Sequence, residues 1–415
     1  MIISKIKIEN YRVIRSFEYE CSSGFNVFIG INGAGKSTLL RAVTILLSWF
    51  VARVKNQKGR GMVLSDEDIA NGADYCLLEI TLTNGISWKL YKQRSTKRTK
   101  PLQVSDFSHL MEYTDYLVED GSLPVIAVYG VDRAVSNIPK RLHRGGKETL
   151  PTAIYDDILY GHVDFRHFFE WLRDREDIEN EAFRHDGDQF CPDKQLQAVK
   201  DAIHLTLPEY GSLRVHRSPQ YFSMEKEGTE FRFDSLSDGE KCYITLVGDI
   251  ARHLAMANEN ADDPLKCEGV IMIDEVDLHL HPSWQITVLE KFRRVFPHCQ
   301  FFLTTHSPHV VSSVNSTEGD KMVVFDNGIM SVPDANVFGK ESDLILLDNF
   351  SLHNVRNNEV QERIDRLWDK LAMGEYEGND LNEQIAWLRT RMDPSDSLFA
   401  KIQLQLALNR KNHRQ

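Results

Sequence analysis

This 415-residue sequence has no paired cysteines, no excess of positive charge and no long apolar runs. Its six cysteines are scattered without a C-x-x-C pair, which excludes a disulfide framework and predicts reduced thiols in the cytoplasm. The 49 Lys and Arg against 61 Asp and Glu give a net charge of −12, so any nucleic-acid contact must come from local patches. The most apolar stretches, such as residues 39–51, are too interrupted to cross a bilayer, and the alternating start is not typical of a signal peptide. We therefore expect a cytoplasmic protein without membrane contact.

Internal repeats, low-complexity tracts and long heptad runs are also absent from the sequence. Alternating apolar residues predict strands over residues 1–30, a hairpin at Asn84-Gly85, a strand over 123–130 and a second hairpin at Glu227-Gly228. Helices are predicted over 37–53, in much of 150–210, after Asp238 and from Pro282, with strands at 269–275 and 300–307. This βαβ alternation indicates a mostly parallel sheet.

The stretch GINGAGKST, residues 30–38, fits the phosphate-binding loop pattern G-x4-G-K-S. It follows an apolar strand and opens an apolar helix, which is the context that such a loop requires. Its main-chain N–H groups surround phosphates, Lys36 reaches the β- and γ-phosphates, and the Ser37 hydroxyl ligates Mg²⁺. The predicted ATP-binding residues are Asn32, Gly33, Ala34, Gly35, Lys36, Ser37 and Thr38.

Two further apolar strands end in polar residues that suit the same site. VIMIDE ends in Asp274, predicted to serve the magnesium ion together with Ser37, and in Glu275, predicted to accept a proton from the attacking water. LTTHS ends near His306, whose neutral imidazole can hydrogen-bond a γ-phosphate oxygen or the water. We therefore predict Glu275 and His306 as the catalytic residues.

A second anion-binding feature lies in SLSDGEK, residues 235–241, directly before a predicted helix. A helix N-terminus presents free N–H groups that favour an anion. One chain with one nucleotide has no evident use for two such sites.

Taken in order, GINGAGKST, LSDGEK, VIMIDEVDLHLHP and TTHSP resemble the Walker A, signature, Walker B with D-loop, and switch-histidine motifs of ABC-type ATPases. The opening of the chain is similar to the RecF/SMC/OLD branch. This resemblance implies that Ser237, Asp238, Gly239 and Glu240 cap the nucleotide of a second protomer, that Asp277 in the D-loop contacts that protomer, and that the chain forms a homodimer or a higher homo-oligomer. Asp238 stands where the transporter signature has glycine, a variation that this branch tolerates.

Further stretches, LPVIAVYGVDRAV, FFEWLRDREDIENEAFR, DEVDLHLHPSWQ and NVFGKESDLILLDNF, resemble the PtuA ATPases of Septu and the related retron-associated ATPases of anti-phage defence. The resemblance implies ATP and Mg²⁺ as ligands and an HNH nuclease of the PtuB kind as partner. In a retron it implies a reverse transcriptase and its non-coding RNA. The main alternative is a RecF/SMC-like ATPase of DNA repair or maintenance; a third reading is a signalling module that binds ATP and hardly hydrolyses it.

The fold implied is α/β, an ABC-type P-loop ATPase head with a mixed sheet and an antiparallel β subdomain, an inserted helical lobe and a C-terminal helical extension. We expect an N-terminal ATPase lobe over 1–145, an inserted helical lobe over 146–215, a second ATPase lobe over 216–345 and a helical region over 346–415. No Toprim nuclease pattern follows the switch histidine, so we expect no intrinsic nuclease.

The sequence allows two interpretations of the histidine pair, the basic runs and the aromatic residues. His279 and His281 form either a metal pair or part of the D-loop. The basic runs 92–100 and 139–147 are solvated loops or a groove for DNA or RNA. The aromatic residues between Phe165 and Leu172 form a core or cover a partner. Arg293 and His298 match a ribonuclease spacing but lie within the ATPase core, and Arg133 is left unassigned. The apolar stripes after Val360 suggest a docking surface.

Overall fold

The computed structural model describes residues 1–95, 103–120, 123–133, 154–155, 159, 165–186, 191–326, 329–333, 336–350, 352 and 354–413. It contains two compact units, Met1–Ile345 and Leu346–Gln415. The expected boundary between residues 215 and 216 falls inside a strand, Tyr210–Arg217. All six cysteines are free thiols.

The first unit is built on a six-stranded sheet in the order β14-β13-β3-β12-β11-β7. Its strands are β3 (Phe25–Gly30), β7 (Val125–Tyr129), β11 (Gly269–Ile273), β12 (Cys299–Thr305), β13 (Lys321–Asp326) and β14 (Ile329–Ser331). All neighbours are parallel except β13 and β14. Every residue of β3, β11 and β12 is buried, as in a sheet that is covered on both faces. The carboxyl ends of the parallel strands therefore meet at one edge of the sheet.

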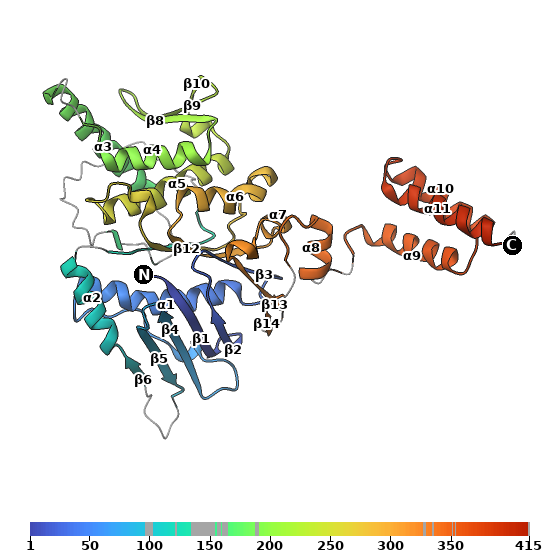
Figure 1. The fold of residues 1–415 in the computed structure, drawn as a ribbon, viewed down its shortest axis with the longest axis horizontal. Helices are drawn as coiled ribbons and strands as arrows, with labels where there is room; N and C mark the ends of the chain where they lie inside the picture. Colours follow the sequence, from blue (N-terminus) through green and yellow to red (C-terminus); the bar gives the residue numbers. More distant parts are fainter. Residues whose placement is uncertain are drawn as a thin grey trace. The chain divides into compact units, whose positions relative to one another are not determined.

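One face of this sheet is covered by α1 (Lys36–Lys55), which also contacts a second, antiparallel sheet of order β2-β1-β4-β5-β6 (Figure 1). The second sheet consists of β1 (Ile3–Tyr11), β2 (Ile14–Glu20), β4 (Tyr75–Leu82), β5 (Ser87–Gln93) and β6 (Gln103–Asp106), with α2 (Ser108–Asp120) beside it. By length and composition alone α1 could cross a membrane, but 72% of its apolar window is buried inside the unit. It is packed as a core helix.

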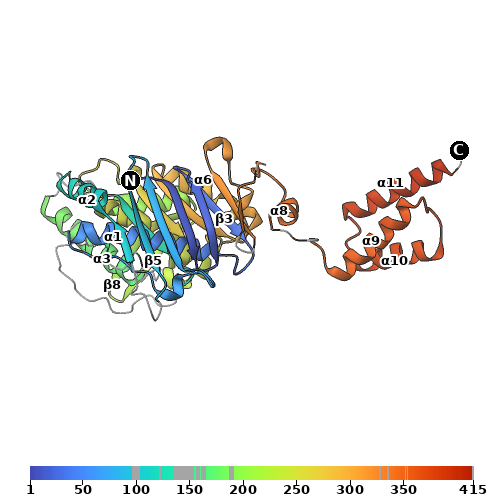
Figure 2. The ribbon, with the colours of Figure 1, turned by 90° about the horizontal axis from the view of Figure 1, so that it is seen from below.

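The other face of the central sheet carries helices (Figures 1 and 2). They are α4 (Lys194–Thr206), α5 (Asp238–Ala257) and α6 (Pro282–Val295), followed outward by α3 (Phe165–Asp186) and a three-stranded sheet of β8 (Tyr210–Arg217), β9 (Gln220–Lys226) and β10 (Thr229–Arg232). Phe168 and Phe169 on α3 are fully buried. A Cβ atom at Gly248 of α5 would lie 2.7 Å from the Phe168 ring, so glycine permits this close packing. Phe168 and Phe169 thus form core, together with the buried Leu172, whereas Trp171 is half-buried and the Phe165 side chain lies outside the described residues.

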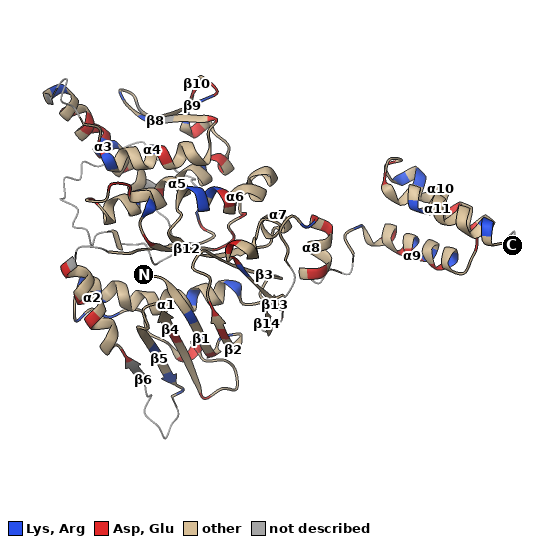
Figure 3. Cartoon of the chain, in the orientation of Figure 1, with Lys and Arg blue, Asp and Glu red and all other residues tan. Residues whose placement is uncertain are grey.

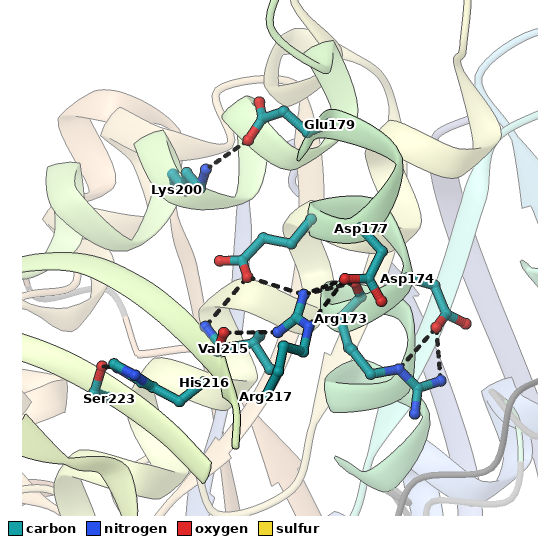
Figure 4. Close-up of polar contacts among 10 residues, drawn as sticks. Arg173, Asp174, Asp177, Glu179, Lys200, Val215, His216, Arg217 and Ser223 are labelled. Carbon is teal, nitrogen blue, oxygen red and sulfur yellow. Dashed lines mark hydrogen bonds and ion pairs between the residues drawn. The ribbon is translucent and has the colours of Figure 1, made fainter. Parts of the chain in front are cut away.

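Polar contacts fix α3 to its neighbours (Figure 4). Arg217 on β8 donates to Asp177 on α3 over 2.6 Å and to Glu176 over 3.4 Å. Burial raises the pKa of Glu176. Lys200 on α4 donates to Glu179 over 3.3 Å. The middle of α3 is thereby joined to both β8 and α4.

The second unit contains α9 (Asn358–Ala372), α10 (Asn379–Arg391) and α11 (Ser397–Asn412), and α8 (Ser342–Asn349) spans the junction of the units. The predicted apolar stripes pack on one another, in a cluster of Ile364, Leu367, Leu371, Leu381, Leu388, Leu398, Phe399 and Ile402. The guanidinium groups of Arg363 and Arg391 both lie over the Trp387 ring, 4.2 and 4.5 Å from its centroid. The stripes after Val360 are therefore mostly internal core, and the large apolar residues of α11 that are exposed are Leu404 and Leu408.

Candidate nucleotide site at the carboxyl edge of the central sheet

The loop between β3 and α1 has the backbone of a phosphate-binding loop. Gly30, Gly33 and Gly35 all have positive φ angles, of 145°, 78° and 114°. A Cβ atom at Gly30 would lie 2.2 Å from the carbonyl oxygen of Phe325 on β13. Glycine is required at Gly30 by this contact and favoured at the other two positions by the left-handed backbone.

Lys36 is buried within this loop, although α1 begins with it. Its Nζ donates to the carbonyl oxygens of Gly30 (2.8 Å) and Ile31 (3.1 Å). Desolvation lowers the pKa of Lys36, and the carboxylates of Asp274 and Glu275 oppose that shift. The ammonium group is thus held at the mouth of the loop, where phosphate oxygens can replace the two carbonyl groups.

The end of β11 brings a carboxylate to the start of α1. The hydroxyl of Ser37 donates to Asp274 Oδ1 over 3.1 Å, and Thr304 on β12 donates to the same oxygen. A hydroxyl beside a carboxylate is an oxygen-only donor set, which suits Mg²⁺. The described residues include no cluster of three or more His, Cys, Asp or Glu that could hold a metal by itself. Ser37 and Asp274 therefore fit a magnesium ion that is also bound by phosphate and water.

Glu275 follows Asp274 with a left-handed backbone, φ 51°. Its N–H donates to Thr304 Oγ1 over 2.7 Å, and the next N–H, of Val276, donates to the Thr304 carbonyl oxygen over 2.9 Å. The structure shows no hydrogen bond to the Glu275 carboxylate from the residues that it describes. This carboxylate is half-buried, close enough to Lys36 to influence its pKa, and available to a water molecule.

His306 comes directly after β12, at the same edge of the sheet. Burial lowers its pKa, and the positive charge of Lys36 lowers it further. The neighbouring Thr305 hydroxyl donates to Asp277 Oδ1 over 2.5 Å. His306 is therefore a neutral imidazole at pH 7, close to Lys36, while Asp277 of the D-loop is held by its own chain.

The two histidines of the D-loop have different surroundings. His279 has a positive φ of 65°, and its carbonyl oxygen lies against Gly239, where an added Cβ would approach to 2.2 Å. His281 caps α6 by accepting from the N–H of Ser283, with Pro282 in the first turn. These contacts favour the D-loop interpretation over a metal pair.

The signature residues form a capping box at the start of α5. The Ser237 hydroxyl accepts from the Glu240 N–H over 3.3 Å, while Glu240 Oε2 accepts from the Ser237 N–H over 2.7 Å. Lys226 on β9 (2.6 Å) and Tyr210 on β8 donate to the other oxygen of Glu240. Hydrogen bonds from Lys226, Tyr210 and Ser237 lower the pKa of Glu240 to about 2, against the effect of burial. The Glu240 side chain is engaged within its own chain, whereas Asp238 is 80% exposed.

Among the described residues, no hydrogen bond joins the signature residues to the phosphate-binding loop of the same chain. The predicted site residues thus fall into two groups. Lys36, Ser37, Asp274, Glu275 and His306 gather at the carboxyl edge of the central sheet. Ser237 caps α5, whose first residues are Asp238, Gly239 and Glu240, and Gly239 lies against the His279 carbonyl oxygen.

Arg133, unassigned from the sequence, contacts this edge from the segment that follows β7. Its guanidinium donates to the main-chain carbonyl oxygens of Asp274 (2.5 Å) and Glu275. Thr304, which contacts Asp274 and the Glu275 N–H, is a second site residue that the motifs do not predict. The signal in the sequence for its role is its position two residues before His306.

The basic runs contribute little to a groove within the described residues. Lys92 pairs with Asp66 at 3.3 Å, and Arg94 donates to three carbonyl oxygens, among them that of Ala73. Residues 96–100 and 139–147 lie outside the described part. Elsewhere Lys and Arg are scattered among Asp and Glu (Figure 3). Arg293 pairs with Asp320 and Glu318, which leaves its guanidinium engaged in structural contacts.

A family model described as "AAA domain, putative AbiEii toxin, Type IV TA system" matches residues 25–312. The chain belongs to this family. The match runs from the first residue of β3 past His306, so it includes every predicted site residue. The chain is an ABC-type ATPase with an α/β P-loop fold, as the sequence predicted.

The chain is similar to the retron Ec83 probable ATPase of Escherichia coli, with 24% identity over 97% of this chain and 86% of the relative. It is 23% identical to the Septu protein PtuA of Bacillus thuringiensis, over 98% of each chain. The predicted resemblance to retron and Septu ATPases is thereby confirmed. Among solved structures, the SMC head domain from Thermotoga maritima covers 81% of this chain and 99% of its own, with 15% identity and a TM-score of 0.43.

Proposed function

We propose that the chain is the ATP-hydrolysing subunit of a bacterial anti-phage defence complex, which dimerises around ATP and controls a partner HNH nuclease. The observation that carries the hydrolytic part is the meeting of Lys36, the Ser37–Asp274 pair and Glu275 at one sheet edge. The names of the full-length relatives, a retron ATPase and a Septu protein, support the defence setting.

In the proposed reaction the main chain of residues 32–38 surrounds the phosphates, and Lys36 exchanges its two carbonyl contacts for β- and γ-phosphate oxygens. Ser37 and Asp274 would hold the magnesium ion, which neutralises phosphate charge when bound. Glu275 accepts a proton from the attacking water, since its carboxylate has no competing donor among the described residues. Neutral His306 hydrogen-bonds the γ-phosphate or the water.

The second anion-binding feature supports a dimer. Ser237 and Gly239 form the N-terminus of a 20-residue helix and make no hydrogen bond to their own phosphate-binding loop in the described structure. In a head-to-tail pair, this helix terminus would face the γ-phosphate held by the partner protomer. Glu240 then acts by holding Ser237 in place, because Lys226 and Tyr210 occupy its carboxylate.

The remaining parts of the proposal concern partners and place. We assign the four sequence regions to two ATPase lobes (1–145 and 216–345), an inserted helical lobe (146–215) and a C-terminal region (346–415) that docks the nuclease or another protomer. The complex works in the cytoplasm and, in a retron, includes a reverse transcriptase with its RNA.

The test is to express the native gene cluster with a tagged chain and to compare wild type with Lys36→Ala. Lys266→Ala is the control, because Lys266 is a 66% exposed lysine that precedes the amino end of β11, whereas the site lies at the carboxyl end of that strand. The proposal expects an HNH protein to copurify with the wild type. It also expects phage protection to be lost in Lys36→Ala and kept in Lys266→Ala. Protection by the Lys36→Ala cluster, or no nuclease in the purified complex, contradicts the proposal.

A further inference from the structure

Arg133 is a buried arginine behind the turn that carries Asp274 and Glu275. It follows the end of β7 by four residues, and only 1% of its surface is exposed. Its guanidinium donates to the carbonyl oxygens of Asp274 (2.5 Å), Glu275 and Gly130 (3.1 Å). All three acceptors are main-chain atoms, and two of them belong to the turn at the end of β11. The Arg133 side chain therefore depends on the backbone conformation of this turn.

Burying a guanidinium group is costly unless a carboxylate or a full set of acceptors compensates for lost hydration. Among the described residues Arg133 forms no ion pair, and its Nε–H has no acceptor. A packed apolar side chain would stabilise this position at lower cost. The location of Arg133 is therefore better explained by its contacts with the main chain of Asp274 and Glu275 than by a contribution to the stability of the fold.

The backbone that Arg133 contacts has an unfavourable conformation at Glu275. Glu275 has a φ of 51°, in the left-handed region that residues with a side chain seldom adopt. The N–H of Glu275 is fixed by Thr304 Oγ1 at 2.7 Å. Its carbonyl oxygen accepts from Arg133 and from the N–H of Leu278, the latter at 2.8 Å. Both peptide groups that flank the Glu275 Cα are thus held, and they fix the direction of its side chain.

Arg133 also contacts the helix that carries the signature residues. The Cys242 thiol on α5 donates to the Arg133 carbonyl oxygen over 3.6 Å. Cys242 lies one turn after Asp238, the first residue of α5. One residue therefore joins the start of α5 to the turn that carries Glu275.

We propose that Arg133 is a positioning residue, which keeps the Glu275 carboxylate oriented toward the attacking water and does not itself contact the nucleotide. The inference rests on the proposed role of Glu275 as the base. Three hydrogen bonds, from Arg133, from the Leu278 N–H and to Thr304, maintain the left-handed backbone of Glu275. The bond from Arg133 is expected to be the strongest, because its donor is charged.

The test measures steady-state hydrolysis and nucleotide affinity of the full-length chain for Arg133→Ala, Arg133→Lys and Glu275→Gln, and for Arg133→Ala combined with Glu275→Gln. Arg173→Ala is the matched control, since Arg173 is a buried arginine on α3, away from the sheet edge. We expect Arg133→Ala to lower kcat about 10- to 100-fold with little change in Kd for ATP. Arg133→Lys should retain an intermediate rate. In the Glu275→Gln background the same replacement should change the residual rate less than twofold.

Different results would overturn the positioning role of Arg133 and the base role of Glu275. A wild-type kcat in Arg133→Ala, or an equal fold-loss with and without the Glu275 carboxyl group, overturns the positioning role. Loss of ATP affinity as large as the loss of kcat also overturns it. If Arg133→Ala does not fold, Arg133→Lys provides the test instead. A wild-type kcat in Arg133→Lys would show that the planar guanidinium is not needed, and it would overturn the positioning role. Near-normal hydrolysis by Glu275→Gln instead refutes the base assignment itself.

Discussion

The hydroxyl of Ser37 lies 3.1 Å from the carboxylate of Asp274, although the two residues are 237 positions apart in the sequence. The contact joins the first turn of α1 to the end of β11. It exists because β3, which leads into α1, and β11 both end at the same edge of a parallel sheet, with β12 between them. The metal-binding half of the proposed site is therefore preformed by the fold.

Replacing Asp274 by Asn should remove the magnesium dependence of ATP binding. The wild type should bind ATP more tightly with Mg²⁺ than with EDTA, whereas Asp274→Asn should lose about 10- to 100-fold of this advantage, because the amide lacks the charge. Titration of a fluorescent ATP analogue with and without Mg²⁺ measures the difference. Glu362→Gln, at a 67% exposed carboxylate on α9, should behave as wild type. Equal magnesium dependence in Asp274→Asn would disprove the assignment.

The pH dependence of hydrolysis should reflect His306. Burial and Lys36 lower the pKa of this imidazole from its usual 6.5, so the group loses its proton at a lower pH than a free histidine does. The free enzyme therefore keeps neutral His306 at and above pH 6.5, and kcat/KM should fall only on acidification below that value. A lowered pKa also means that the unfolded chain binds more protons here, so this residue makes unfolding easier as the pH falls through 6.5.

The control for this prediction is His309, three residues further, whose Nδ1 contacts the Ser342 hydroxyl. His306→Gln should lower kcat/KM and abolish the acid limb that depends on this imidazole, while His309→Gln should keep the wild-type profile. A pH–rate profile from pH 5 to 8 distinguishes them. An acid limb that persists unchanged in His306→Gln contradicts the role of this residue.

The C-terminal unit should be dispensable for nucleotide binding. Truncation after Phe350 keeps α8 and the contact between Ser342 and His309, and it removes a helical cluster with its own core. We expect monomeric ATP binding within about twofold of wild type and loss of association with the nuclease or a second protomer on a sizing column. Unchanged complex formation by the truncated chain would refute the docking role.

Two single substitutions separate the candidate docking surfaces. Leu404 on α11 is 64% exposed, and Phe183 near the end of α3 is 60% exposed. If the C-terminal unit docks the partner, Leu404→Asp should weaken association at least tenfold and Phe183→Asp should leave it intact. The reverse result would move the docking surface to the inserted lobe.

The features predictable from the sequence were those encoded locally. The phosphate-binding loop requires glycine at specific backbone positions, and the strand ends at Asp274 and His306 followed from continuous apolar runs. The elements β6, α2, β8, β13 and β14 were not predicted individually. The strands β13 and β14 are defined by their pairing, of β13 with β3 and of the three-residue edge strand β14 with β13, rather than by clear alternation.

Contacts that depend on tertiary structure could not be read in the same way. Asp277, predicted to face another protomer, accepts a hydrogen bond from Thr305. Glu240, predicted as part of the signature, is held by Lys226 of a neighbouring hairpin. No motif pairs these residues in the sequence, because Thr305 meets Asp277 and Lys226 meets Glu240 only when the strands, the hairpin and α5 have packed together.

The most direct test of the central claim, a site shared between two protomers, uses two inactive variants. Lys36→Ala lacks the phosphate-binding lysine, and Ser237→Arg places bulk and charge at the N-terminus of α5. If each site combines Lys36 of one chain with Ser237 of the other, a mixed dimer contains one doubly damaged site and one intact site. Random one-to-one mixing makes half of the dimers mixed, so about a quarter of wild-type hydrolysis should return if the sites act independently, and less if they are coupled. With subunit exchange verified, no recovery of hydrolysis would contradict the shared site.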